Sequence, residues 1–155
     1  MATVELTFSA LPAHVRTARL VATAIARRTG VAEALLDEVR LAVGEACSRA
    51  VEAHRVHCPG EPIRIEIRDD SGRFEVTVTD SAPNDDIQSS TGTANGLVAA
   101  GTSADWMFGI VPEMPGLGIA VIAGLADDVE VSPGPTGVRI RMSWPAATPN
   151  GVPAR

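Results

Sequence analysis

Aromatic residues are scarce in this chain, at 3% of its 155 residues, and tyrosine is absent altogether. Leucine, valine, isoleucine and alanine must therefore pack the core, which a hydrophobic content of 45% allows. Cysteine is also rare: Cys47 and Cys58 are too few for a disulfide framework and suit free thiols in a reducing compartment. We find no apolar run of membrane-span length and no signal peptide, so we expect a cytoplasmic protein.

Basic residues are outnumbered by acidic ones, 13 to 19, which gives a net charge of -6 and a pI near 5.0. This balance argues against a general electrostatic attraction to DNA, RNA or an anionic membrane. The length suits one domain with a substantial core, which we place at residues 1–145, followed by a flexible tail at 146–155.

Hydrophobic periodicity predicts the order of the elements. Apolar and polar residues alternate at 4–8, 63–68, 74–79 and 138–144, and a shorter strand is expected at 129–131. Helical spacing covers residues 13–29, 32–54 and 116–127. The order β-α-α-β-β-lid-α-β-β predicts an α+β two-layer sandwich, in which helices cover one face of a mixed, mainly antiparallel sheet.

No period runs through residues 81–115, and so long a patternless segment inside a compact domain is typical of a functional lid or of disorder. It contains an apolar island at residues 106–111, Trp-Met-Phe-Gly-Ile-Val. This island either packs back on the body as a short element or forms a lid edge or partner contact, and the sequence leaves both open.

Two of the predicted helices carry distinctive polar faces. The helix at 13–29 shows a basic face away from its apolar stripe, formed by Arg16, Arg19, Arg27 and Arg28. On the helix at 32–54, Glu45 and Arg49 lie on a stripe beside the core, from which a side chain can reach into a cleft.

Three elements of this layout could hold a nucleotide and act on it. The turn Gly116-Leu117-Gly118 opens a helix, whose free N–H groups and positive dipole end suit phosphate. Asp80 ends a strand and can accept a hydrogen bond from an amino group such as adenine N6. Glu45 could take a proton from a serine hydroxyl.

A metal site is the alternative for a second group of residues. His54, His57 and Cys58 lie close together in the sequence, and Cys47 lies on the preceding helix. This spacing matches a zinc site only loosely. Solvated histidines and a small buried cysteine fit the pattern better, so we predict no metal site.

Several motifs occur in one order along most of the chain. They are Phe8-Ser-Ala-Leu-Pro-x-x-Val-x-x-Ala-Arg-Leu20, Val43-Gly-Glu-Ala-Cys-Ser-Arg-Ala50, Val78-Thr-Asp80, Gly116-Leu-Gly-Ile119 with Leu125-Ala-Asp-Asp-Val129, and Thr136 followed by Val138-Arg-Ile140. Together they resemble the serine-kinase anti-sigma factors of the GHKL (Bergerat-fold, histidine kinase-like) ATPase superfamily, whose fold the chain is then expected to have.

The resemblance implies an ATP site built from separate elements. Glu45 would be the general base that activates a serine on an anti-anti-sigma protein. Asp80, with Thr136 and water, would bind the adenine. Gly116 and Gly118 would hold the phosphates under the lid.

The resemblance also implies protein partners. Arg19, with Arg16 on the same basic face, would bind a sigma factor or an anti-anti-sigma protein of the STAS type. The opening helix region would contribute to a homodimer.

The chain departs from the family pattern at the nucleotide site. Arg49 stands where the family has the asparagine that holds magnesium, and an arginine offers only donors and a permanent positive charge, so it cannot ligate a cation. Ala82 and Asn84 replace the two glycines of Asp-x-Gly-x-Gly, and Ala82 adds a methyl group where the backbone should approach adenine. Arg49 could pair with Glu45 at i,i+4, or replace magnesium as a counter-charge for phosphate.

We therefore expect an anti-sigma-type regulator that works by partner exchange and whose binding of ATP or ADP is weak or lost. Magnesium-dependent phosphoryl transfer would lack its metal clamp. The alternative is a working ATP-dependent kinase that phosphorylates a serine of a STAS protein. A third interpretation keeps nucleotide binding as a non-catalytic switch.

Overall fold

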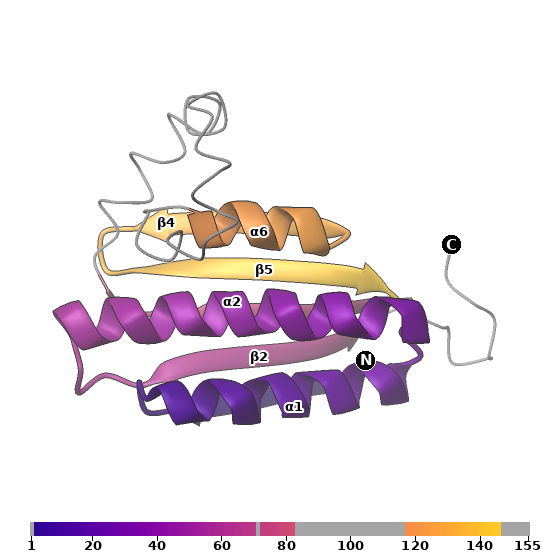
Figure 1. Ribbon diagram of the computed structural model, residues 1–155, viewed down its shortest axis with the longest axis horizontal. Helices are drawn as coiled ribbons and strands as arrows, with labels where there is room; N and C mark the ends of the chain where they lie inside the picture. Colours follow the sequence, from indigo (N-terminus) through magenta and orange to yellow (C-terminus); the bar gives the residue numbers. More distant parts are fainter. Residues whose placement is uncertain (1, 71, 83–116, 147–155) are drawn as a thin grey trace, which may run out of the picture.

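The computed structural model describes residues 2–70, 72–82 and 117–146 (Figure 1). The elements are β1 (Ala2–Phe8), α1 (Pro12–Thr29), α2 (Glu33–His57), β2 (Ile63–Asp70), β3 (Arg73–Thr79), α6 (Leu117–Leu125), β4 (Asp128–Gly134) and β5 (Gly137–Pro145). Predictions about the lid beyond Ala82, the island at 106–111, Asn84, Gly116 and the tail beyond residue 146 lie outside the described residues.

The strands form one five-stranded sheet in the order β1-β2-β3-β5-β4. The three described helices lie on the same face of this sheet, with α1 and α2 antiparallel to each other (Figure 1). The predicted α+β two-layer class is therefore confirmed. The sheet, which we expected to be mixed but mainly antiparallel, is antiparallel in all four pairings of the described strands.

Strict alternation explains why the sheet has one buried and one polar face. On β2, the isoleucines at 63, 65 and 67 are at most 1% exposed, while the intervening charged residues face the other side. The core continues on β3 and β5 with Phe74, Val76, Val78, Val138, Ile140, Met142 and Trp144. The turn predicted between β2 and β3 is confirmed, because Asp70 pairs with Arg73 and Gly72 has a φ of 88°.

The helix ends follow local chemistry in one case and tertiary packing in another. Pro12 opens α1, and Gly30 ends it in the left-handed conformation with a φ of 96°. α2 runs to His57, three residues past the predicted end at His54, because His54 is a fully buried core residue rather than a terminal one.

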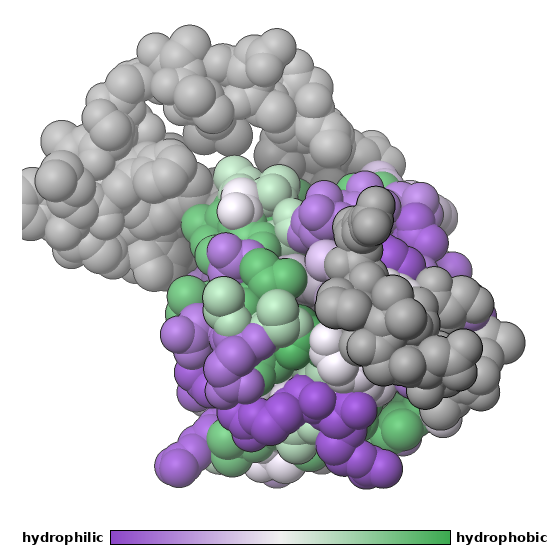
Figure 2. Space-filling view, turned by 90° about the vertical axis from the view of Figure 1, so that its right-hand side faces the viewer, coloured by the Kyte–Doolittle hydropathy of each residue, from purple (hydrophilic) through white to green (hydrophobic). Residues whose placement is uncertain are grey.

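The core lies between the helical layer and the sheet. In the end view, hydrophobic residues form a band on the described surface, with hydrophilic residues on either side of it (Figure 2). None of the described helices combines the length and the apolar character needed to cross a membrane.

Candidate functional site

Asp80 is held at the end of β3 by the main chain. Its side chain is 2% exposed, and its Oδ1 atom accepts hydrogen bonds from the backbone N–H groups of Ala82 and Val138, both at 3.1 Å. The backbone N–H of Asp80 in turn donates to the carbonyl of Val138 at 2.9 Å. This arrangement fixes the carboxylate, and among the described residues no main-chain group donates to its other oxygen, Oδ2.

Arg49 occupies that second oxygen. Its Nη1 donates to Oδ2 of Asp80 at 2.8 Å, and the arginine side chain is 20% exposed. The predicted ion pair between Arg49 and Glu45 is therefore wrong: among the described ion pairs, the partner of Arg49 is Asp80, while Glu45 is exposed. A buried carboxylate attracts a guanidinium more strongly than an exposed one, because water screens the charges less there.

The two residues that follow Asp80, Ser81 and Ala82, are also held by hydrogen bonds at the end of β3. Ala82 is 1% exposed and donates to Asp80, and the backbone N–H of Ser81 donates to Nε2 of His54 on α2 at 2.8 Å. Three consecutive residues at the end of β3 are thus tied by their own hydrogen bonds to α2 or to one another. The methyl group of Ala82 belongs to the packed wall of this corner.

His54 is a structural histidine that the sequence analysis missed. It is 0% exposed, which corrects the prediction of a solvated histidine. Because Ser81 N–H can only donate, Nε2 must accept, so Nδ1 carries the proton and donates to the carbonyl of Glu61 at 2.8 Å. The signal was available, because His54 lies four residues after Ala50, on the buried stripe of α2.

The remaining nucleotide-site candidates, Glu45, Thr136 and Gly118, make no hydrogen bond to Asp80 among the described residues. Glu45 is exposed on α2, and Thr136 is exposed in the turn between β4 and β5. Gly118 lies in the first turn of α6. The described residues therefore bring together Arg49, Asp80 and Ala82, with no described hydrogen bond from Glu45 or Thr136 to them.

The residues at this corner do not fit a magnesium ion at position 49. The arginine side chain presents donors only, and both oxygens of Asp80 are already engaged. In the ranges that the structure describes, no three His, Cys, Asp or Glu side chains are grouped so that they could hold a metal. Both ring nitrogens of His54 are committed to the backbone.

The two partner-binding candidates, Arg16 and Arg19, lie on α1. A groove of about 300 Å³ separates α1 from α2, and it is lined by Pro12, Val15, Arg16, Arg19, Ser48, Val51 and Glu52. The Nε atom of Arg19 is buried and has no hydrogen-bond acceptor in the part of the chain that the structure describes. Cys47 is buried, which confirms the predicted buried cysteine. This burial raises the pKa of its thiol to about 12, and the nearby charge of Arg19 partly opposes the rise.

The described residues form a two-layer α+β domain with a buried aspartate at the end of a central strand. The sequence matches the family model of the histidine kinase-like ATPase domain over residues 8–144, and the chain belongs to this family.

Two solved structures have a similar fold. The RsbU and RsbW domains of Rv1364c from Mycobacterium tuberculosis superpose with a TM-score of 0.63 at 16% identity, covering 100% of this chain and 34% of that one. The SiaB-SiaC complex from Pseudomonas aeruginosa gives a TM-score of 0.62 at 13% identity, covering 91% of this chain and 89% of that one. The chain thus spans about a third of the first of these proteins. A search of curated proteins found no match.

Proposed function

We propose that this protein is a non-catalytic, anti-sigma-type regulator that works by exchanging protein partners. The observation that carries the proposal is the ion pair between Arg49 and Asp80, at 2.8 Å. It fills, from within the chain, the acceptor that an adenine amino group would need, and it leaves no metal ligand at position 49. ATP or ADP binding is therefore weak or lost, and phosphoryl transfer from Mg²⁺-ATP has no metal clamp.

A nucleotide would have to displace Arg49 before it could reach Asp80. Oδ1 already has two main-chain donors, so Oδ2 is the oxygen for which a ligand would compete. Displacement would leave a guanidinium without its buried partner, which costs several kcal/mol for such a pair. That cost is subtracted from any binding free energy that the phosphates could provide.

The proposed partners are a sigma factor, a STAS-domain anti-anti-sigma protein, or both in turn. The support is the family membership, together with a similar structure that was solved as a complex of two proteins. α1 offers the contact surface, because it carries four arginines and no acidic residue in a chain of net charge -6. Arg16 and Arg19 would contact the partner, and the domain at 1–145 would act as a cytoplasmic homodimer with residues 81–115 as its lid.

The test separates catalysis from partner binding. A STAS protein captured from the native cell is incubated with the protein, radiolabelled ATP and Mg²⁺. We expect a stable complex without nucleotide, no phosphoserine, and a complex weakened at least tenfold by the double substitution Arg16→Ala and Arg19→Ala. Serine phosphorylation that is abolished by Glu45→Ala would falsify the non-catalytic reading and establish the kinase instead.

Calorimetry tests the nucleotide site alone. ATP and ADP are titrated with and without Mg²⁺ into the protein and into Arg49→Asn. We expect no heat from the natural protein below millimolar nucleotide. Tight binding that does not require Mg²⁺ would support the switch interpretation, with Arg49 as the counter-charge of the phosphates.

A further inference from the structure

His54 joins the end of α2 to two other parts of the chain by a pair of hydrogen bonds that only the neutral ring can make. Nδ1 donates to the carbonyl of Glu61 in the loop before β2, and Nε2 accepts from the backbone N–H of Ser81 just after β3, both at 2.8 Å. We infer that His54 is a pH-sensitive latch: its neutral ring holds Ser81, and protonation of the ring releases this residue and so loosens the corner at Asp80.

The bond to Ser81 requires one protonation state of the ring. A backbone N–H can only donate, so Nε2 must keep its lone pair. A second proton on the ring would place two N–H groups against each other at this short distance. His54 is 0% exposed, so in the closed corner that proton has no bulk water to which it could be donated. The closed corner therefore excludes the charged ring, whereas an open corner accepts it.

The titratable groups nearest to His54 offer no acceptor for a second ring proton. Cys58 lies one turn further along α2, and its amide donates to the carbonyl of His54. Glu61 is exposed, and its backbone carbonyl already accepts from Nδ1. Both carboxylate oxygens of Asp80 are engaged, Oδ2 by Arg49 and Oδ1 by two main-chain amides. Among the described residues, the backbone N–H of Ser81 is therefore the group that faces Nε2.

The other elements around this end of α2 add no charge that would stabilise a protonated ring. α6 has no ionisable side chain, and β5 begins at this corner with Gly137. α1 contributes Arg16, which shares a groove with Glu52 just before His54, and a nearby cation disfavours a second one. Glu52 is exposed and lies 3.7 Å from Arg55. In the described ranges, no carboxylate is thus placed to stabilise a charged ring.

Release of Ser81 would reach Asp80 through the next peptide group. The N–H of Ala82 is one of the two main-chain donors to Oδ1 of Asp80, at 3.1 Å. Once Ser81 leaves the ring, Ala82 can move with it and withdraw this donor. Oδ1 would then keep the amide of Val138, and Oδ2 would keep Arg49. Proton uptake by the ring is thereby coupled to how firmly the buried carboxylate is held.

The direction of the pH effect is set by which state of the corner binds the proton. The open corner binds one proton more than the closed corner, so acid favours opening. Solvated histidines take up this proton at about pH 6.5, and the latch is therefore closed above that range. Below it, the ratio of closed to open corners falls by up to about tenfold for each pH unit.

Amide hydrogen exchange followed by NMR measures this opening at single residues. The protection factor of Ser81, which is the ratio of the intrinsic to the observed exchange rate, should fall by about fivefold or more from pH 6 to pH 5. At both pH values, Ser81 should be less protected than Val76 in the middle of β3, which is paired within the sheet. Protection of Ser81 that does not change with pH, or that equals the protection of Val76, would overturn the latch.

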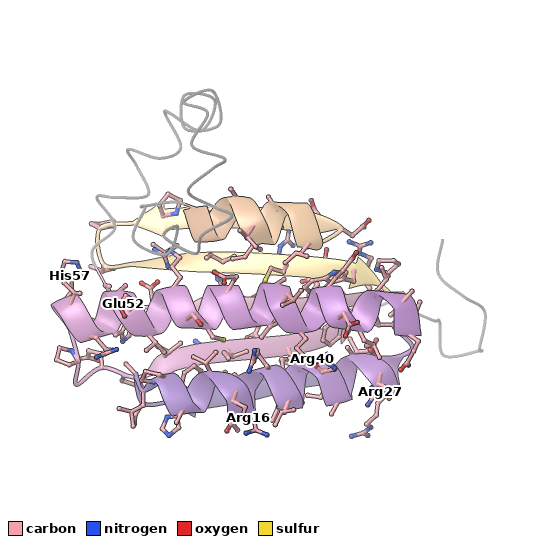
Figure 3. The ribbon with its side chains drawn as sticks, in the orientation of Figure 1. Arg16, Arg27, Arg40, Glu52 and His57 are labelled. Carbon is pink, nitrogen blue, oxygen red and sulfur yellow. The ribbon has the colours of Figure 1, made fainter. Side chains whose placement is uncertain are left out.

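Two matched variants separate the latch from a general effect of acid. His54→Gln keeps an amide oxygen near Nε2 for Ser81 but takes up no proton in this range, so the protection of Ser81 should become independent of pH. His57 is exposed at the end of the same helix (Figure 3), and His57→Gln should leave the pH dependence as it is in the natural protein. An undiminished pH dependence in His54→Gln would refute the latch.

The ring nitrogens of the natural protein give a test that needs no variant, should His54→Gln fail to fold. Long-range ¹H–¹⁵N spectra follow the three histidines separately, with His14 and His57 as internal references. We expect His54 in the Nδ1–H form at pH 7, and we expect its charged form to appear in step with the loss of protection at Ser81. A charged His54 beside a fully protected Ser81, or the Nε2–H form at pH 7, would overturn the proposal.

Discussion

Arg49 and Asp80, 31 positions apart in the sequence, form a 2.8 Å ion pair between the middle of α2 and the end of β3. In the function that we propose, this one side chain would remove two features of a nucleotide site, because it would replace a metal ligand and also satisfy the oxygen left for a base. The pair is largely shielded, with side-chain exposures of 20% and 2%. The pair is therefore expected to affect the stability of the fold as well as the chemistry of the site.

Breaking this pair should destabilise the protein strongly. Arg49→Met leaves the carboxylate of Asp80 buried without its counter-charge, and we expect a loss of about 3 kcal/mol in the free energy of unfolding, measured by urea denaturation. The control is Arg40→Ala, which removes an exposed pair with Asp37 and should cost less than about 0.5 kcal/mol. A loss for Arg49→Met no larger than that of the control would contradict the role assigned to the pair.

Gly137 should tolerate no side chain. A Cβ atom there would overlap the carbonyl oxygen of Asp80, which is backbone and cannot rotate away. We expect Gly137→Ala to lower the free energy of unfolding by more than about 3 kcal/mol, or to prevent folding. Gly134→Ala in the same hairpin is the matched control, since its Cβ would meet only the carbonyl of Gly137 at an ordinary 3.5 Å. Similar stabilities of the two variants would refute this steric account.

Cys47 should make stability fall at alkaline pH. Burial raises the pKa of its thiol from 9.0 to about 12, so between these values the unfolded chain releases a proton that the folded chain retains. The folded state therefore loses stability as pH rises above 9, by roughly 1 kcal/mol at pH 10 from this group. Urea denaturation of the natural protein and of Cys47→Ala at pH 8 and pH 10 isolates the contribution. A stability difference between them that does not change with pH would rule it out.

His54 should be needed for stability through both ring nitrogens. His54→Ala removes the acceptor of Ser81 and the donor to Glu61 and leaves a cavity, so we expect a loss of about 3 kcal/mol. His54→Asn retains a donor near the Nδ1 position and should lose about half as much. Hydrogen exchange at the Ser81 amide should accelerate in both variants. An Asn variant as unstable as the Ala variant would show that the bond to Glu61 contributes nothing.

Helices and strands with one buried face could be predicted from the sequence, because buried residues recur in them every two, three or four positions. The isoleucines of β2 and the alternation of β5 each gave a strand within a few residues of the observed bounds. Gly30 and Gly72 marked a helix end and a turn for local backbone reasons. The register between strands, and with it the fully antiparallel order, depends on long-range pairing that no local pattern contains.

The sequence predicted which residues form the candidate site, but it did not predict which of them contact each other. Arg49, Asp80 and Ala82 were expected at one corner, and they are there. The helical i,i+4 rule favoured Glu45 as the partner of Arg49, because sequence spacing reports neighbours on the helix surface alone. It cannot report that the end of β3 places a buried carboxylate within reach of the same guanidinium.

The hydrogen bonds of Asp80 also give this residue a structural role. Its Oδ1 atom joins the end of β3 to the start of β5, and the backbone of Gly137 lies against its carbonyl. This corner therefore depends on the aspartate whether or not a ligand reaches it. The presence of Asp80 in this chain follows from the architecture alone, so it does not by itself indicate that a nucleotide binds.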